Sequence, residues 1–398
     1  MIAVLQNISG SALSPSEFSH GDADVNVVGR ASDDLDRNVY CVLGMPIDAI
    51  DMDQALRRID TAVRDNEPFL LTTTNLNFLV ISLTNSEFRE SILMSDLCAA
   101  DGMPIIWIAW LMGIPIKRRL AGSDMFEALK ITRSAHGTLK TFLFGAKEGV
   151  AAIASERLNQ SAGGVFCVGS ICPGFGSVDE LCQDQFINEI NSSGADFLVA
   201  ALGAKKGQLW LHQNHPRLRI PIRAHLGAVI NFEAGTVKRA PKAFREWGLE
   251  WLWRIKEEPH LFGRYRHDGL VLLGLLATRV LPLAIFAQWL RIQAWRRTLP
   301  FAISKINDDG AIRIRMTGYA TKDHVPDAIS QFRDAIAGEK PIIIDLTRTR
   351  ALDARFFGLL LVLRKQLLAS GRTLQFIGAS PGMKRLFRLN GLASLLNG

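Results

Sequence analysis

Apolar runs alternate with helical patterns along the central part of the chain. Short apolar runs bounded by small or polar residues predict strands at 69–73, 97–100, 140–145, 164–169, 196–202 and 222–226. Helical spacing falls between them at 85–95, 124–134, 148–160 and 180–192. An earlier strand is expected at 39–44, with a helix from 46 to about 63. This alternation predicts an α/β fold: a Rossmann-like, mostly parallel sheet with helices on both faces.

The pattern changes after residue 245. Aromatic and basic residues mix in 246–266, and 269–290 is then apolar apart from four residues, among them Arg279 and Pro282. That length would allow a membrane span of about 20 residues, but a central arginine is costly in a bilayer. Three arrangements stay open: a surface-lying or re-entrant helical pair, a true span, and helices buried in protein.

The last hundred residues have strand and helix patterns of their own. Strands are expected at 312–316, 341–346 and 373–377, and helices at 356–368 and 381–389, which together make a small α/β module. Residues 1–38 are rich in Ser, Gly, Asp and Asn without a sustained period, and are expected to be a disordered leader. The predicted organisation is therefore a leader (1–38), an α/β domain (39–245), an aromatic and apolar appendage (246–298) and the C-terminal module (299–398).

Composition adds a charge preference. The chain has 398 residues, 48% of them hydrophobic, with a net charge of +7 and a pI near 9.3. This favours an anionic partner, such as a nucleotide phosphate or anionic lipid. A nucleic acid is disfavoured, because the Trp and Arg residues cluster beside an apolar run. Five cysteines without a Cys-x-x-Cys pair fit a reduced cytosolic setting, and no signal peptide is expected.

Small polar residues and a carboxylate follow two of the predicted strands. Thr73 and Asn75 close the 69–73 strand, and Asp101-Gly102 closes the 97–100 strand. Ligands of α/β proteins gather where parallel strands end. An aspartate in such a cleft can take a proton from a hydroxyl group. The alternative is an ordinary strand-to-helix turn, in which Asp and Gly are common.

Three basic motifs are candidates for binding phosphate. Arg119 precedes a helix that Ser123 or Asp124 can cap, and it could pair a phosphate or stay solvated. Lys206 and Gln208 belong to a glycine-rich turn that opens a helix, which suits a diphosphate or a plain surface turn. Small residues at Gly227 would let backbone approach a ligand near Lys238 and Arg239, and a solvated loop is the alternative. His212-x-x-His215 lacks a third ligand, so a metal site is not expected.

Taken together, these motifs resemble the WecG/TagA/CpsF glycosyltransferase family, the inverting group that includes the teichoic-acid N-acetylmannosaminyltransferase. The resemblance covers about 40–266. It rests on motifs in matching order: Thr73-x-Asn75, Asp101-Gly102, Arg119-x-x-Gly122-x-Asp124, Phe144-Gly145, Gly174-x-Gly176, the run 235–241, and Gly248-Leu249-Glu250-Trp251-x-x-Arg254-x-x-x-Glu258-Pro259.

The resemblance implies transfer of a sugar from a UDP-sugar donor to a lipid-linked diphosphate saccharide at the cytoplasmic membrane face. It implies that Asp101 is the base, that Thr73 and Asn75 line the pocket, and that Arg119 lies near the diphosphate. The tail around Arg254 and Arg264 would close the site and touch the membrane. Lysine and arginine can stabilise the departing diphosphate, so no metal or other cofactor is expected.

One motif departs from the family pattern. The family usually has Pro-Lys-Gln-Glu after the fifth strand, where this chain has Lys205-Lys206-Gly207-Gln208. Lys206 matches, and Gly207 takes the place of the glutamine. Either Gln208 substitutes after a one-residue shift or the nucleotide contact differs.

The C-terminal module resembles a STAS domain, through the strand at 342–346 and the run 351–360. Ala354 and Arg355 occupy the region where regulatory members carry a phosphorylatable serine, so a constitutive interaction module that binds a protein partner is expected. The leading hypothesis is a bacterial exopolysaccharide or envelope-polysaccharide glycosyltransferase, peripheral or monotopic at the cytoplasmic face of the inner membrane. The rival is a catalytically degenerate scaffold that recruits partners of an assembly complex through the STAS-like domain.

Overall fold

The computed structural model describes residues 33–132, 137–161, 163–296, 299–308 and 310–396. The predicted leader lies outside the described residues as far as residue 32. Its last part is folded, because Asp34–Asp36 form a 3-10 turn and the side chain of Leu35 joins the hydrophobic core. The folded region therefore includes residues 33–38, and the predicted boundary of the leader at residue 38 is too late in the chain.

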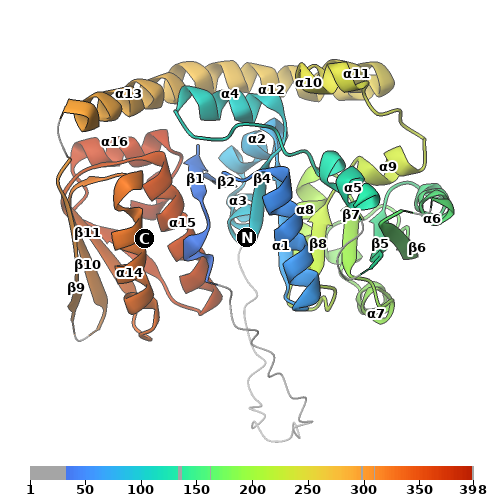
Figure 1. Cartoon of the computed structure of the whole chain (residues 1–398), viewed down its shortest axis with the longest axis horizontal. Helices are drawn as coiled ribbons and strands as arrows, with labels where there is room; N and C mark the ends of the chain where they lie inside the picture. The colour runs from blue at the N-terminus through green and yellow to red at the C-terminus, as the bar shows by residue number, and fades with distance from the viewer. Residues whose placement is uncertain (1–32, 133–136, 162, 297–298, 309, 397–398) are drawn as a thin grey trace, which may run out of the picture. The chain divides into compact units, whose positions relative to one another are not determined.

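Six described strands form the central sheet of the α/β domain (Figure 1). Their order across the sheet is β4-β3-β8-β7-β5-β6, and every neighbouring pair is parallel. All six predicted strands are confirmed, as is the Rossmann-like class of fold. The carboxyl ends of parallel strands meet at one edge of a sheet, which is where the candidate residues lie. The bounds are β3 Phe69–Thr74, β4 Leu97–Ala100, β5 Leu139–Gly145, β6 Val165–Ile171, β7 Phe197–Ala201 and β8 Ile222–His225.

Helices cover both faces of this sheet, as predicted. Strand residues such as Leu71 and Val199 pack with α1, α5, α6 and α9 on one face. Their neighbours Leu70 and Leu198 pack with α7 and α8 on the other, because successive side chains of a strand point to opposite faces. The bounds are α1 Met52–Arg64, α2 Leu76–Thr84, α3 Ser86–Leu93, α4 Met103–Leu111, α5 Gly122–Ile131, α6 Val150–Gln160, α7 Asp184–Ser192, α8 Ala204–Asn214 and α9 Val229–Glu233.

A buried hairpin precedes this sheet. Strands β1 (Val39–Val42) and β2 (Met45–Asp48) pair antiparallel. The sequence predicted the first strand only, and it placed the start of the helix at residue 46. The helix starts at Met52 instead, because Asp51 caps it: the Asp51 side chain accepts a hydrogen bond from the backbone N–H of Gln54 at 2.8 Å.

A helix of 38 residues, Pro259–Arg296, follows two shorter helices, α10 (Lys242–Glu246) and α11 (Glu250–Glu257). It contains α12 (Phe262–Leu275), a π-helical turn (Leu276–Val280) and α13 (Leu281–Arg296). The apolar run is therefore part of one long helix and does not form a helical pair, which was one of the three arrangements that the sequence left open. Pro282 does not break the helix, because the π-helical turn before it accommodates the proline ring and the missing N–H.

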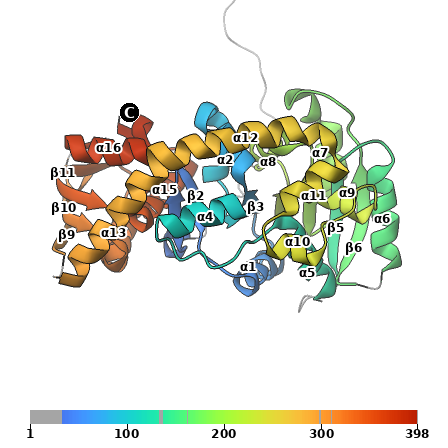
Figure 2. The same ribbon diagram turned by 90° about the horizontal axis from the view of Figure 1, so that it is seen from above.

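This long helix is long and apolar enough to cross a membrane, by length and composition. It lies along the protein, however, and its parts contact α2, α4 and α16 (Figure 2). Leu275, Val280 and Leu283 on its inner side belong to the main hydrophobic core. The outer side of the helix is exposed in large part.

The C-terminal module has a four-stranded sheet of order β12-β11-β10-β9, in which only β9 runs antiparallel to its neighbour. The strands and helices predicted after residue 299 are confirmed, while β9 and α14 are additions that the sequence analysis did not include. The bounds are β9 Phe301–Asn307, β10 Ile312–Ala320, α14 Val325–Ile336, β11 Ile342–Leu352, α15 Ala354–Ala369, β12 Leu374–Ile377 and α16 Pro381–Leu389.

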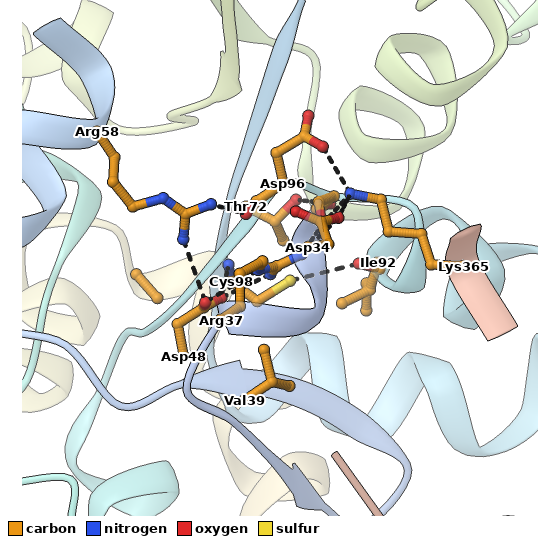
Figure 3. Close-up of polar contacts among 12 residues, drawn as sticks. Asp34, Arg37, Val39, Asp48, Arg58, Thr72, Ile92, Asp96, Cys98 and Lys365 are labelled. Carbon is orange, nitrogen blue, oxygen red and sulfur yellow. Dashed lines mark hydrogen bonds and ion pairs between the residues drawn. The ribbon is translucent and has the colours of Figure 1, made fainter. Parts of the chain in front are cut away.

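The C-terminal module shares one hydrophobic core with the α/β domain. Helix α15 lies against β1 so closely that a Cβ atom on Gly358 would be 2.1 Å from the carbonyl oxygen of Val39. Beside this contact, Lys365 on α15 pairs with Asp34 at 2.5 Å and with Asp96 at 2.6 Å (Figure 3). Because burial of unpaired charge is costly, these pairs fix how α15 packs on the domain.

The same ionic cluster reaches the start of β4. Arg37 pairs with Asp48 at 2.7 Å, and Asp48 accepts a hydrogen bond from the backbone N–H of Cys98 at 2.8 Å (Figure 3). Burial acts to raise the pKa of Asp96, but Lys365 and the backbone N–H of Leu70 hold that pKa below its usual value. The strand that leads to Asp101 is therefore anchored at its other end by buried ion pairs.

Candidate active site

The carboxyl ends of β3 and β4 bring Thr73, Asn75 and Asp101 together. The backbone N–H of Asp101 donates to the carbonyl oxygen of Thr74 at 2.8 Å. Gly102 has a φ of +97°, which favours glycine, and a Cβ atom there would lie 3.8 Å from Cβ of Asn75. Asn75 also caps α2, because its side chain accepts from the N–H of Phe78 at 3.1 Å. The predicted grouping of these three residues thus follows from strand register.

Asp101 has surroundings that suit a proton acceptor. Burial, helped by the carboxylates of Glu250 and Asp124, raises the pKa of Asp101 to about 7. Arg119 and a hydrogen bond from the backbone N–H of Gly122 act in the opposite direction. A carboxyl group with a pKa near 7 is partly ionised at neutral pH and can both accept and return a proton.

Arg119 and Asp124 are the centre of an ion-pair network beside Asp101. Arg119 pairs with Asp124 at 3.0 Å and with Glu250, which opens α11. Asp124 also pairs with Arg239 and, at 3.0 Å, with Arg245. Three arginines, which come from segments outside α5, thus converge on the Asp124 carboxylate of α5. The net positive charge of this group suits an anionic ligand such as a diphosphate.

Some guanidinium donors in this region have no protein acceptor. Within the described residues, Nε of Arg239, Nε of Arg245 and Nη1 of Arg254 are enclosed and without a hydrogen-bond partner. Arg254 also lies over the ring of Phe232, with 5.4 Å from its Cζ to the ring centroid. A cavity of about 220 Å³ lies next to Arg239 and is lined by Ser123, Phe126, Glu127, Lys130, Val229, Phe232, Glu233 and Arg239.

The appendage closes over the start of α4. A Cβ atom on Gly248 would lie 2.3 Å from Cγ of Met103, so the turn before α11 packs directly on the residues after Asp101. Lys238 is exposed, and its carbonyl oxygen accepts from Nε1 of Trp253 at 3.0 Å. Arg264 is also exposed and lies over the ring of Tyr265.

The predicted residues on α8 do not join this group. Lys206 donates to the carbonyl oxygen of Gly176. Gln208 is fully buried: its amide accepts from Thr72 at 3.2 Å and donates to Ser91 at 3.1 Å. Its side chain is used inside the protein, so its position does not support a shifted nucleotide contact.

The sequence reasoning missed His225, the last residue of β8. Its ring occupies the space beside Gly207, where an added Cβ atom would lie 2.1 Å from Cδ2 of His225. Gly227 borders the same ring, at 3.2 Å from Nε2 to an added Cβ. Burial lowers the pKa of His225 to about 4, so the ring is neutral at pH 7. Gly207 departs from the family motif, and the ring of His225 occupies the space that a side chain at position 207 would need.

Glu250, Asp124 and Arg245 were given no ligand or catalytic role from the sequence, although the first two stand in the motifs that suggested the family. The pairing of Arg119 with Glu250 joins two motifs that are 131 positions apart, and local spacing in the sequence does not reveal such a contact. Within the described residues, no group of three His, Cys, Asp or Glu side chains is placed to hold a metal ion.

The fold is that of an α/β protein with a pocket of ionisable residues at the strand ends, and comparison with known proteins gives its family. The chain belongs to the glycosyl transferase WecG/TagA/CpsF family, which it matches over residues 40–284, and residues 304–397 match the Mlab STAS domain. It is thus a glycosyltransferase with a C-terminal STAS domain.

Two curated relatives of the chain carry the same enzymatic name. The chain is 25% identical over 199 residues to the N-acetylglucosaminyldiphosphoundecaprenol N-acetyl-beta-D-mannosaminyltransferase of Bacillus spizizenii, which covers 50% of this chain and 75% of that protein. It is also 25% identical over 228 residues to the protein of the same name from Staphylococcus aureus. That aligned region covers 56% of this chain and 87% of the relative.

Proposed function

We propose that this protein transfers a hexosyl or N-acetylhexosaminyl group, with inversion, from a UDP-sugar to a polyprenyl-diphosphate-linked saccharide. The pathway would be bacterial exopolysaccharide or other envelope polysaccharide synthesis. The observation that carries the proposal is the Asp101 carboxyl group, with its pKa of about 7, beside the arginine network. The names of the relatives, which include a diphosphoundecaprenol-linked acceptor, support the acceptor class.

In the proposed reaction, a hydroxyl oxygen of the acceptor attacks the anomeric carbon of the donor sugar. The hydroxyl proton passes to the Asp101 carboxylate, the bond from the anomeric carbon to the diphosphate oxygen breaks, and UDP leaves. Arg119, Arg239 and Lys238 would stabilise the negative charge that grows on the diphosphate. Since side chains can supply this charge, we expect transfer to persist after treatment with a metal chelator.

The proposed location is the cytoplasmic face of the bacterial inner membrane, with the protein peripheral or monotopic. A lipid-linked acceptor is held in the bilayer, and the exposed outer side of the long helix supports contact with lipid. The STAS domain would bind a protein partner constitutively, because Ala354 and Arg355 offer no hydroxyl group for phosphorylation.

The Asp101→Asn variant tests the catalytic assignment. We expect transfer to a short-chain lipid-diphosphate acceptor to fall at least about 100-fold, because the variant has no base, while UDP binding is kept. Asp327→Asn, an exposed residue on α14, is the matched control and should transfer at the wild-type rate. Wild-type transfer by Asp101→Asn would overturn the assignment.

A catalytically degenerate scaffold remains the second candidate, and the altered Lys205–Gln208 run is the observation that favours it. Calorimetric titration with UDP separates the two. Binding in the micromolar range supports the transferase, and no binding at millimolar UDP supports the scaffold.

A further inference from the structure

Helix α4 presents large apolar side chains to solvent directly after the candidate base. Trp107, Trp110 and Leu111 are 43%, 54% and 43% exposed. They are spaced at i, i+3 and i+4, so they share one side of the helix. The other side of α4 is buried through Ile105, Ile108 and Ala109. An exposed stripe with two tryptophans is costly in water and needs a partner.

The exposed stripe of α4 belongs to a larger surface. Helices α4 and α10–α13 lie on the same side of the protein in both views (Figures 1 and 2). Arg291 on α13 donates to the carbonyl oxygen of Gly113, just after α4, at 3.1 Å. We call this surface the apolar layer; its exposed large apolar residues are Trp107, Trp110, Leu111, Trp247, Trp251, Leu252, Phe262, Leu270, Leu273, Leu281, Ile285, Trp289, Ile292 and Trp295.

In the middle of the long helix, the charged residue Asp268 lies on the inner side with the apolar residues that join the core, and large apolar residues face outward. Asp268 is buried and accepts a hydrogen bond from Asn77 at 3.2 Å. Arg279 is half-buried and points toward the C-terminal module, with its Nη1 3.6 Å from a Cβ atom added to Gly391. Leu270 and Ile285, by contrast, are 64% and 71% exposed. This arrangement suits contact with lipid, since Asp268 has a partner within the protein and the large apolar side chains face outward.

Exposed cations border the layer. Lys117 and Arg118 follow α4, and Arg264, Arg266 and Arg296 lie on the long helix, all exposed. Tryptophan and arginine together are typical of helices that lie in the membrane interface, where the rings enter the headgroup region and the cations meet anionic lipid. This charge favours an anionic bilayer over a second copy of this basic chain, whose own cations would be brought face to face.

We propose that α4 and the long helix form one membrane-docking face, and that Trp107, Trp110 and Leu111 enter an anionic bilayer. This rests on the proposed function, since a lipid-linked acceptor must reach Asp101. Helix α4 has nine residues and a length of about 13 Å. Asp101 precedes it by two positions, so the base would stand at headgroup depth, where the diphosphate of the acceptor lies.

The test is flotation of the full-length protein with vesicles of phosphatidylcholine and phosphatidylglycerol. We expect the double variant Trp107→Ser, Trp110→Ser to bind these vesicles at least about tenfold more weakly, because two exposed rings that would enter the bilayer are lost. Phe166→Ser, at a 46% exposed residue on β6 outside the layer, is the matched control and should bind as the wild type does. If the double variant does not fold, Trp110→Ser alone gives the same comparison with a smaller loss.

Transfer assays separate this inference from the proposed function. The tryptophan variant should keep wild-type transfer to a short-chain acceptor in solution and lose transfer to an acceptor embedded in vesicles. Asp101→Asn should lose both and still float with vesicles. Unchanged flotation of the tryptophan variant would overturn the docking face. The inference would also be overturned if the wild-type protein were a dimer, the tryptophan variant were a monomer, and flotation were the same for both. The apolar layer would then join two copies of the chain.

Discussion

The ionisation of Asp101 should be visible in the pH dependence of transfer. Burial raises the pKa of this carboxyl group to about 7, and a general base must be ionised to act. We therefore expect kcat/KM to rise about tenfold per pH unit below pH 7 and to level off above it. Measurement of kcat/KM from pH 5 to 9 checks this, and a rate that is flat from pH 5 to 7 would contradict it.

Two neighbours of Asp101 should move this pH profile in opposite directions. Arg119 lowers the pKa of Asp101 and Glu250 raises it. Arg119→Gln should therefore shift the acid limb to higher pH, and Glu250→Gln should shift it to lower pH. A purely structural role for these residues would lower the rate without any displacement of the limb, so the position of the limb is the decisive readout.

The contact between Gly207 and His225 predicts whether alanine at position 207 raises or lowers the free energy of unfolding. Gly207 lies in the first turn of α8, where alanine normally stabilises a helix by about 1 kcal/mol relative to glycine. A Cβ atom there would nevertheless lie 2.1 Å from the His225 ring. Gly207→Ala should therefore lower the free energy of unfolding by about 1–3 kcal/mol.

The matched experiment is the same substitution in a His225→Ala background, where the space is open and Gly207→Ala should be stabilising. Urea unfolding of the wild type, the two single variants and the double variant gives the coupling energy between positions 207 and 225. Equal effects of Gly207→Ala in both backgrounds would show that the histidine does not set the requirement for glycine.

At the scale of elements, the packing of α15 on β1 depends on one glycine. An added Cβ on Gly358 would lie 2.1 Å from the carbonyl oxygen of Val39, and backbone cannot move aside as a side chain can. Gly358→Ala should therefore lower the free energy of unfolding by at least about 2 kcal/mol. Gly382 on α16, with its nearest neighbour at 4.0 Å, is the control, and alanine there should be neutral or stabilising. Equal stability of the two variants would refute the close approach.

The elements that the sequence predicted well share a simple physical origin. Strands such as β3 and β7 begin with continuous apolar runs that are buried on both faces, so their pattern does not depend on distant partners. The β1–β2 hairpin was half missed because Pro46 resembles a helix start, whereas here it lies within a strand. The sequence left the arrangement of the apolar run open, because the π-helical turn that joins α12 and α13 before Pro282 has no sequence signal of its own.

At the scale of the whole molecule, the candidate site was predictable only in part. Thr73, Asn75 and Asp101 follow from strand ends and parallel topology, which local sequence determines. The inward direction of Gln208 and the position of His225 depend on how α8 packs on β8, and no local pattern reports this. The same holds for Lys365, whose partner Asp34 lies 331 positions away in the chain.

The shared core makes a prediction about cooperativity. Residues of the α/β domain, the long helix and the STAS domain belong to one hydrophobic cluster, and the pairs of Lys365 with Asp34 and Asp96 bridge the first and last of these. Separate folding units would leave much of that apolar surface in water, at about 25 cal/mol per Å². We therefore expect one calorimetric unfolding transition for the full chain rather than two.

Lys365→Ala tests this coupling, because it removes the cation from a buried cluster and leaves carboxylates without their partner. Loss of one member of a buried ion pair costs about 3–5 kcal/mol, so the whole transition should move down by several degrees and stay single. Lys384→Ala, at an exposed lysine on α16, should leave the transition in place. Two separate transitions in the wild type, or a Lys365→Ala variant in which only part of the heat absorption moves, would show that the STAS domain folds independently of the transferase domain.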